Sequence, residues 1–258
     1  MIEVAVLGLG AFVPGYGGLA AWSAGESNAD LVKASGHLIP ARQRRRASGL
    51  SRALADAYAE SLEQATLDAT RVASVFGSAL GESATMIGLL DQMWDENAAL
   101  SPMKFATSVH NAASGTVSIA TKNRGYTTSI GADYDTPAMS LIEGISWVAA
   151  HDENVIVCCG DEQPPPDLVP DGLGWGLLSA AIALGPRSAA SAHGLGRLSL
   201  PSIETATSEP LRRDAALERN PCIGLLDLVH ALSSRSSGTV ALDRGQGRGY
   251  ATRIWVEG

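Results

Sequence analysis

The sequence predicts an α/β protein. Through residue 160, apolar and β-branched runs alternate with segments whose apolar residues recur every three or four positions. The runs 2–9 and 154–160 are continuously apolar, which is typical of strands buried on both faces. This alternation favours βαβ units on a mostly parallel sheet with right-handed crossovers.

The same patterns predict the order of the elements. Strands are expected at 2–9, 72–78, 127–132, 154–160, 177–184, 195–200, 239–242 and 251–256. Helices are expected at 48–70, 86–94, 112–122, 137–150 and 223–233. The glycines and prolines of 8–18 predict a loop, and the prolines of 164–170 predict a linker. We therefore divide the chain into a βαβ core, 1–162, and a linker with a shorter second part, 163–258, which completes one compact domain.

Composition excludes several classes of protein. The 258 residues include 19 Lys plus Arg and 27 Asp plus Glu, a net charge of −8, which argues against nucleic-acid binding. The three cysteines predict reduced core residues, and the five histidines lack metal-ligand spacing, so no metal or cofactor is expected. No secretion signal and no apolar run of about 20 residues is visible, so we expect a soluble, cytoplasmic protein without a membrane span.

Two local motifs have ordinary explanations. Gly8 and Gly10 follow a strand, but the third glycine of a dinucleotide-binding turn is missing and no helix is predicted next. The basic run in front of the helix at 48 is typical of solvated surface, or it contacts an acidic partner. Its members are Arg42, Arg44, Arg45 and Arg46.

A series of segments resembles β-ketoacyl synthases, and more closely the short, ketosynthase-like chain length factors of the aryl-polyene type. They are 4–11, the Arg-rich entry to the helix at Ser48, Gly81-Glu82, Ser101-Pro102, 108–112, Gly125 and 155–162. The resemblance covers residues 1–162 well and the rest loosely. It implies a thiolase-like (ketosynthase) α/β fold with a shortened second half.

The resemblance also implies that the condensing machinery is degenerate. Counting back from 160–162 places Tyr134, flanked by Asp133 and Asp135, where condensing enzymes carry a nucleophilic cysteine. Tyrosine is a poor acyl acceptor, and neighbouring carboxylates oppose its ionisation. The two histidines of the family's His-x-Thr-Gly-Thr and Gly-His-x-x-Gly segments have no counterpart. Independent condensation is therefore not expected.

The implied function is that of a non-condensing subunit. It would form a heterodimer with an active β-ketoacyl synthase and help shape its acyl tunnel, in polyene, polyketide or fatty-acid-like biosynthesis. The substrates would be carried on acyl carrier protein, which the basic run could dock. Strand residues that pair across the dimer would be Thr127, Thr128, Ser129 and Ile130. Tunnel candidates are Met86, Leu89, Leu90, Met93, Trp94, Met103 and Phe105, although such a stripe is also typical of plain core.

Two other functions remain open from the sequence. One is an independent hydrolase or decarboxylase of acyl thioesters, with Asp133, Tyr134, Asp135 or His110 as acid and base. Carboxylates at a helix start can equally be simple caps. The other is a purely structural scaffold of the synthase complex.

Overall fold

The computed structural model describes residues 2–94, 99–190 and 194–256. Counted over these residues, nine strands form one sheet in the order β3-β2-β4-β5-β1-β6-β9-β7, with β8 paired to β9. In chain order they are β1 (Glu3–Phe12), β2 (Ala73–Gly77), β3 (Thr127–Ile130), β4 (Val155–Asp161), β5 (Leu178–Gly185), β6 (Arg197–Ser199), β7 (Ser202–Ile203), β8 (Gly238–Ala241) and β9 (Tyr250–Trp255). All eight predicted strands are confirmed, and β7 is an addition.

The prediction of a mostly parallel sheet is wrong. Among the named strands, the only parallel pairs are β2 with β3 and β2 with β4. β5 is antiparallel to both of its neighbours, β4 and β1. The segment 162–177 contains no crossover helix, so the chain returns from β4 directly into an antiparallel neighbour. The strands β1 to β4 still point in one direction, and β5 lies between β4 and β1.

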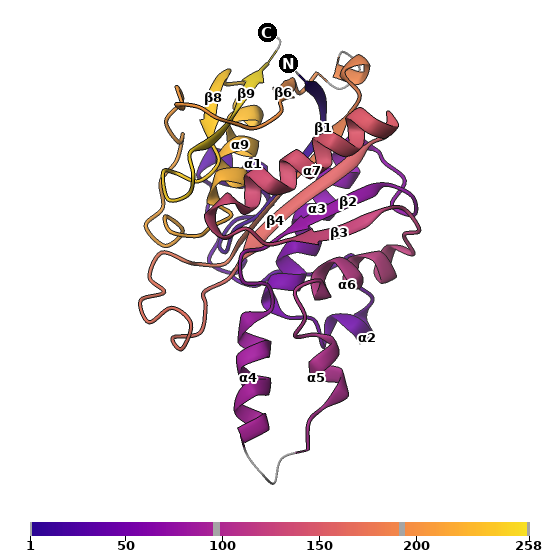
Figure 1. The fold of residues 1–258 in the computed structure, drawn as a ribbon, viewed down its shortest axis with the longest axis vertical. Helices are drawn as coiled ribbons and strands as arrows, with labels where there is room; N and C mark the ends of the chain where they lie inside the picture. Colours follow the sequence, from indigo (N-terminus) through magenta and orange to yellow (C-terminus); the bar gives the residue numbers. More distant parts are fainter. Residues whose placement is uncertain (1, 95–98, 191–193, 257–258) are drawn as a thin grey trace.

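Helices cover both faces of the sheet (Figure 1). On one face lie α3 (Gly49–Ala65) and α6 (Ala112–Thr121). On the other lie α7 (Thr136–His151), α9 (Ile223–Ser233) and the short α1 (Leu19–Ala24). Each layer has its own apolar core, because alternate residues of the central strands point to opposite faces. The short helices α1 and α2 (Ala41–Arg44) lie in segments where the sequence predicted no helix.

The two glycines of the first strand allow α3 to pack directly on β1. A Cβ atom on Gly8 would lie 2.3 Å from the carbonyl oxygen of Ser61, and one on Gly10 would lie 2.2 Å from that of Ala57. Any larger residue would therefore push the helix away from the strand. Close packing, and not nucleotide binding, explains this pair of glycines.

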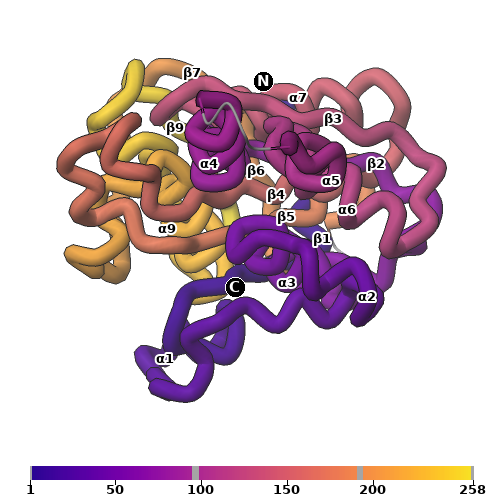
Figure 2. The backbone as a smooth tube through the Cα atoms, turned by 90° about the horizontal axis from the view of Figure 1, so that it is seen from below, coloured from indigo at the N-terminus to yellow at the C-terminus, as the bar shows by residue number. Residues whose placement is uncertain are grey.

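Two helices project from the body of the protein. They are α4 (Ser83–Trp94) and α5 (Pro102–Ala106), and they lie side by side beyond the carboxyl ends of β2 and β3 (Figures 1 and 2). Ser101 starts α5, since its hydroxyl accepts a hydrogen bond from the backbone nitrogen of Lys104 at 3.3 Å. We call α4 and α5 together the arm.

Candidate functional site

A sharp turn follows β3 at the carboxyl end of the parallel strands. A single 3-10 turn spans Asp133–Asp135, and α7 begins at Thr136. Asp133 has a φ of 51°, a left-handed conformation that residues other than glycine rarely adopt. The Thr136 hydroxyl holds the turn, because it donates to the Asp133 carbonyl at 2.7 Å and accepts from the backbone nitrogen of Ala132 at 3.0 Å. A strand-to-helix turn therefore lies where the sequence places the degenerate nucleophile position.

The second part of the chain covers this turn. The ring of Tyr134 meets the buried Trp175 edge-on, with ring centroids 6.0 Å apart. Asp135 Oδ1 accepts a hydrogen bond from the backbone nitrogen of Arg248 at 2.9 Å, and Oδ2 lies 3.4 Å from Nε of the same arginine. Asp135 is thus engaged in holding the loop that carries Arg248, which is a structural role.

His110 joins two loops at the same end of the sheet. Its Nε2 atom lies 2.7 Å from the carbonyl oxygen of Ser78. A Cβ atom on Gly81 or Gly131 would come within 3.0 Å of the imidazole ring, so both glycines make room for it. Within the described part of the chain, no hydrogen bond or ion pair joins any two of the four acid–base candidates, His110, Asp133, Tyr134 and Asp135. The structure brings them to one end of the sheet without assembling a proton relay.

A buried carboxyl group lies at the carboxyl end of β4. Asp161, at the end of β4, is 1% exposed and accepts hydrogen bonds from the hydroxyl of Ser78 at 2.6 Å and the backbone nitrogen of Ala79 at 2.9 Å. Burial raises its pKa above the usual range. The Cys222 thiol lies 3.1 Å from Oδ2, and its own pKa is raised by burial and by neighbouring Cys159 and Asp161. All three cysteines are free and buried, which confirms the prediction of reduced core residues.

The arm exposes most of its apolar side chains. On α4, Met86, Leu90, Met93 and Trp94 are exposed, Trp94 to 84%, and Leu89 is the only buried apolar side chain. On α5, Met103 and Phe105 are exposed, Phe105 to 67%. The sequence left open that this stripe is plain core. Of the stripe, only Leu89 is buried, so the other members form an apolar surface that no residue described by the structure covers.

β3 forms one edge of the sheet (Figure 1). Its four residues, Thr127, Thr128, Ser129 and Ile130, are all half-buried. One side of the strand pairs with β2, and on the other side its backbone groups pair with no strand in the part of the chain that the structure describes. The open edge of β3 and the arm therefore belong to the same end of the molecule.

A family profile described as "Beta-ketoacyl synthase, N-terminal domain" matches residues 20–244. This chain belongs to that family. Its thiolase-like fold is confirmed by solved structures. One chain in the structure of the ketosynthase ApeO in complex with its chain length factor ApeC, from Xenorhabdus doucetiae, is 20% identical with a TM-score of 0.71, over the whole of both chains.

Two further structures have the same fold. A chain of the complex AntDE:AntF, a type II polyketide synthase acyl carrier protein with its ketosynthase bound to the hexaketide, is 12% identical (TM-score 0.68) over 98% of this chain and 99% of that one. The ishigamide ketosynthase/chain length factor is 16% identical (TM-score 0.60) over 79% of this chain and 66% of that one. A comparison with curated protein sequences gave no match.

The basic run of this ketosynthase-family chain lies in and around α2. Arg42 and Arg46 line a groove of about 580 Å³ between α2, α3, α5 and α6, whereas Arg44 and Arg45 lie outside it. None of these four arginines forms an ion pair with any residue that the structure describes. Their charge is therefore available to an acidic partner.

Two carboxylates near the groove were missed by the sequence reasoning. Glu82, directly before α4, lines the groove and is 3% exposed. Burial and the nearby charges of Glu82 and Asp161 raise the pKa of Glu162 from 4.5 to about 7. The available signal was an acidic residue placed just after each of two apolar strands, since such positions meet at the carboxyl edge of a sheet.

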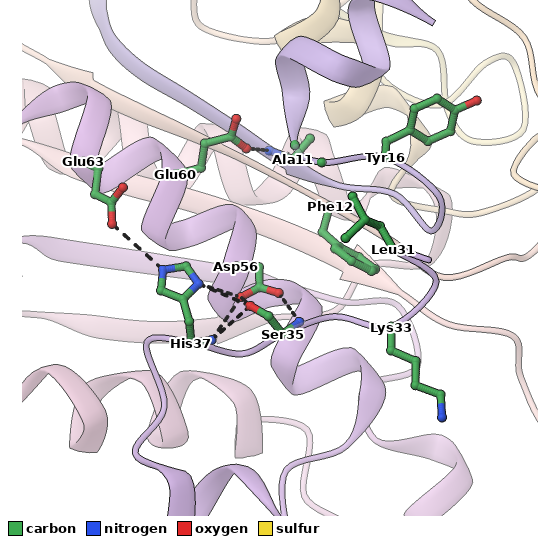
Figure 3. Close-up of a pocket in the computed structure, with 12 residues that line it drawn as sticks. Ala11, Phe12, Tyr16, Leu31, Lys33, Ser35, His37, Asp56, Glu60 and Glu63 are labelled. Atoms are coloured by element: carbon green, nitrogen blue, oxygen red, sulfur yellow. Dashed lines mark hydrogen bonds and ion pairs between the residues drawn. The ribbon is translucent and has the colours of Figure 1, made fainter. Parts of the chain in front are cut away.

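A second cavity, of about 350 Å³, lies beside α3 near β1 (Figure 3). It contains Ser35, His37 and Asp56, a combination that suggests an activated serine. The Ser35 hydroxyl lies 3.3 Å from Nδ1 of His37 and donates to Asp56 at 2.9 Å, and Asp56 lies 3.2 Å from the same Nδ1. Serine and aspartate thus share one ring nitrogen, so no relay through the imidazole exists. Asp56 also accepts a hydrogen bond from the backbone nitrogen of Ser35 at 2.7 Å, so the cluster holds the loop around Ser35 against α3.

Over residues 2–94, 99–190 and 194–256, no group of three His, Cys, Asp or Glu side chains is arranged to hold a metal ion. No helix in those ranges is long and apolar enough to span a bilayer.

Proposed function

We propose that this chain is a chain length factor. It performs no condensation itself, pairs with an active β-ketoacyl synthase and shapes the tunnel that holds the growing acyl chain. The observation that carries this proposal is the apolar arm beside the open edge of β3. Contiguous exposed apolar surface of this kind is typical of an interface, and large apolar interfaces are typical of obligate complexes.

Two further observations support the proposal. Tyr134 lies in a strand-to-helix turn, which the family resemblance equates with the position of the nucleophilic cysteine, and Trp175 and the Arg248 loop cover that turn. In addition, two of the structures with this fold are described as ketosynthases with a chain length factor. The aryl-polyene type of product, carrier-bound substrates and a cytoplasmic location form part of the proposal through the family resemblance.

Chain-length control would follow from packing alone. A strand of the partner would pair with β3, using the unpaired backbone groups of Thr127 and Ser129. The arm would then lie against the partner, and apolar side chains at its end, above all Met93 and Trp94, would close the acyl tunnel. A smaller side chain there leaves a longer tunnel, because the space removed from the wall becomes available to the acyl chain.

The basic run would dock the acidic carrier protein. Surface charges mainly accelerate association, so their effect should appear in the carrier-protein dependence and should weaken with salt. Reversal of two charges, Arg44→Glu with Arg45→Glu, should raise the carrier-protein concentration needed for half-maximal turnover of the complex about tenfold. An unchanged dependence of turnover on the carrier-protein concentration would contradict this part of the proposal.

The main experiment is co-expression with the ketosynthase encoded beside this chain. The mass of the complex and its product distribution would be measured for the wild type, Met93→Ala and Trp94→Ala. Ile203→Ala serves as a matched control, since Ile203 is 67% exposed on β7, away from the arm. We expect a one-to-one complex with longer products from the two arm variants and unchanged products from the control.

The other functions give different results in the same experiment. A scaffold would lose assembly in the arm variants but never change product length. An independent hydrolase would form no complex and would turn over malonyl or acyl thioesters alone, with loss of that activity in Asp133→Ala or Asp135→Ala. A complex whose products depend on the Tyr134 hydroxyl, tested with Tyr134→Phe, would also contradict the proposal.

A further inference from the structure

The groove at the foot of the arm ends on a buried, half-satisfied carboxylate. Glu82 Oε1 accepts hydrogen bonds from the hydroxyls of Ser48 at 2.7 Å and Ser51 at 2.6 Å. Oε2 is buried and has no hydrogen-bond partner among the residues that the structure describes. The carboxyl group thus has both of its donors on one oxygen and one unused acceptor atom on the other.

No basic side chain forms an ion pair with Glu82 among the residues that the structure describes. Asp161, the other buried carboxyl group nearby, is occupied by Ser78 and Ala79. Glu162 adds a second negative group, and its pKa of about 7 reflects burial first and then repulsion from Glu82 and Asp161. The buried carboxyl groups therefore favour a cation at Glu82, although basic side chains lie at the rim of the groove.

We propose that this groove binds a lysine or arginine side chain of the partner subunit, whose N–H groups donate to Glu82 Oε2. The inference rests on the proposed function, which supplies the partner. Lysine and arginine carry hydrogen-bond donors and no acceptors, as the unused oxygen requires. Their methylene stems suit the apolar walls formed by Met103, Ala106 and Ala112. The groove also adjoins the arm, so a partner that covers the arm reaches it.

The basic rim of the groove does not exclude such a ligand. Arg42, Arg46 and Lys104 are exposed, and water and salt screen their charges. Glu82 is buried, where the same charge interacts more strongly with a neighbouring cation. Acidic residues of the partner can pair with the rim while one cation enters to the end of the groove.

The pair of carboxyl groups gives the site a pH dependence. The charged groups that act on Glu162 are Glu82, which lines the groove, and Asp161. The basic side chains at the rim of the groove are Arg42, Arg46 and Lys104. The ring of His110 contacts Gly81, next to Glu82. A bound cation lowers the pKa of Glu162, so binding releases a proton near neutral pH. Affinity should therefore rise as the pH increases from about 6 to about 8.

The first test uses the complex with the co-expressed ketosynthase. Glu82→Gln keeps an acceptor for the two serines and removes the charge, and it should weaken the complex about 10- to 100-fold at about pH 8. Glu63→Gln is the matched control, because Glu63 on α3 is exposed, and it should have no effect. Glu162→Gln should abolish the pH dependence of the affinity. An unchanged dissociation constant in Glu82→Gln would overturn the proposal.

The second test needs no partner. The full chain, labelled at its methionine methyl groups, would be titrated with N-acetyl-arginine amide and, as a neutral control, N-acetyl-citrulline amide. We expect saturable shifts of the Met103 methyl signal with the arginine compound only, and none in Glu82→Gln. If Glu82→Gln does not fold, Glu82→Asp is used instead. Its shorter side chain keeps the carboxyl group but places it farther from the ligand, so binding should weaken several-fold.

The two tests separate the inference from the proposed function. If the arginine compound binds specifically but no complex with the ketosynthase forms, the chain length factor proposal is wrong and the cation site is supported. If a stable complex forms but the substitution of Glu82 has no effect in either test, the cation-site proposal is wrong and the chain length factor proposal stands.

Discussion

The thiol of Cys222 lies 3.1 Å from Oδ2 of Asp161, and this contact joins the start of α9 to the end of β4. Asp161 simultaneously receives the Ser78 hydroxyl from the end of β2. Asn220 strengthens the same junction, because its side-chain nitrogen donates to the carbonyl oxygens of Asp161 at 3.1 Å and Gly176 at 2.9 Å. The residue Asp161 thus connects the two parts of the chain at the carboxyl end of β4.

Asp161→Ala should therefore destabilise the protein far more than Cys222→Ala. The first change leaves several buried donors without an acceptor, and we expect the unfolding free energy to fall by about 3 kcal/mol or more. The second removes one weak donor and a small volume, for about 1 kcal/mol. Urea denaturation of both variants checks this, and equal losses would show that Asp161 is not the centre of the junction.

Stability should depend on pH through Glu162. Its pKa is about 7 in the folded chain, mainly because of burial, against an ordinary value of 4.5. The folded state therefore binds the proton more tightly, so the stabilisation is complete below about pH 4.5 and is lost as the pH rises through 7. We expect the unfolding free energy to fall by about 2 kcal/mol between about pH 5 and pH 8, a value reduced by partial exposure. Glu162→Gln should flatten this dependence, and an unchanged slope would contradict the assignment.

Two glycine substitutions should change the stability in opposite directions, because Gly10 lies where α3 packs on β1 and Gly115 lies in open space on α6. Gly10→Ala places a Cβ atom 2.2 Å from the Ala57 carbonyl oxygen and should lower the unfolding free energy by about 3 kcal/mol or prevent folding. Gly115→Ala on α6 meets no atom within 4 Å and should raise it by about 0.5–1 kcal/mol. Thermal melting of both variants distinguishes them, and a mild effect at Gly10 would mean that the helix can move.

The open edge of β3 predicts a selective loss of assembly. The backbone nitrogens of Ser74 and Ser78 donate to the carbonyls of Tyr126 and Ile130, so the backbone of Ser129 points away from β2. Ser129→Pro removes an outward N–H and leaves the β2 ladder intact. We expect it to abolish the complex with the ketosynthase while preserving the fold, judged by size and circular dichroism.

Ser129→Ala is the control for that experiment. It removes the hydroxyl that lies 2.9 Å from the Ser114 hydroxyl but keeps the backbone N–H. Assembly should therefore be retained in Ser129→Ala. Loss of the complex in both variants would assign the effect to the side chain and not to strand pairing.

The sequence alone determined the order and type of nearly all elements. Continuous apolar runs marked the strands, and the three-to-four spacing marked the long helices, because these periods reflect local burial. The positions of β4, α7 and α9 were obtained in this way to within a few residues. The sequence also placed Tyr134 at a strand-to-helix turn, since the segments around it carry the family resemblance.

The tertiary structure decided what local patterns do not encode. The direction of β5 depends on how the 162–177 segment returns, and the exposure of Met93 and Trp94 depends on where the arm projects. An apolar stripe looks the same in sequence whether it faces its own core or another subunit. Likewise, Glu82 and Glu162 are 80 residues apart, so only the folded sheet could show that Glu162 lies near Glu82, which lines the groove beneath the arm.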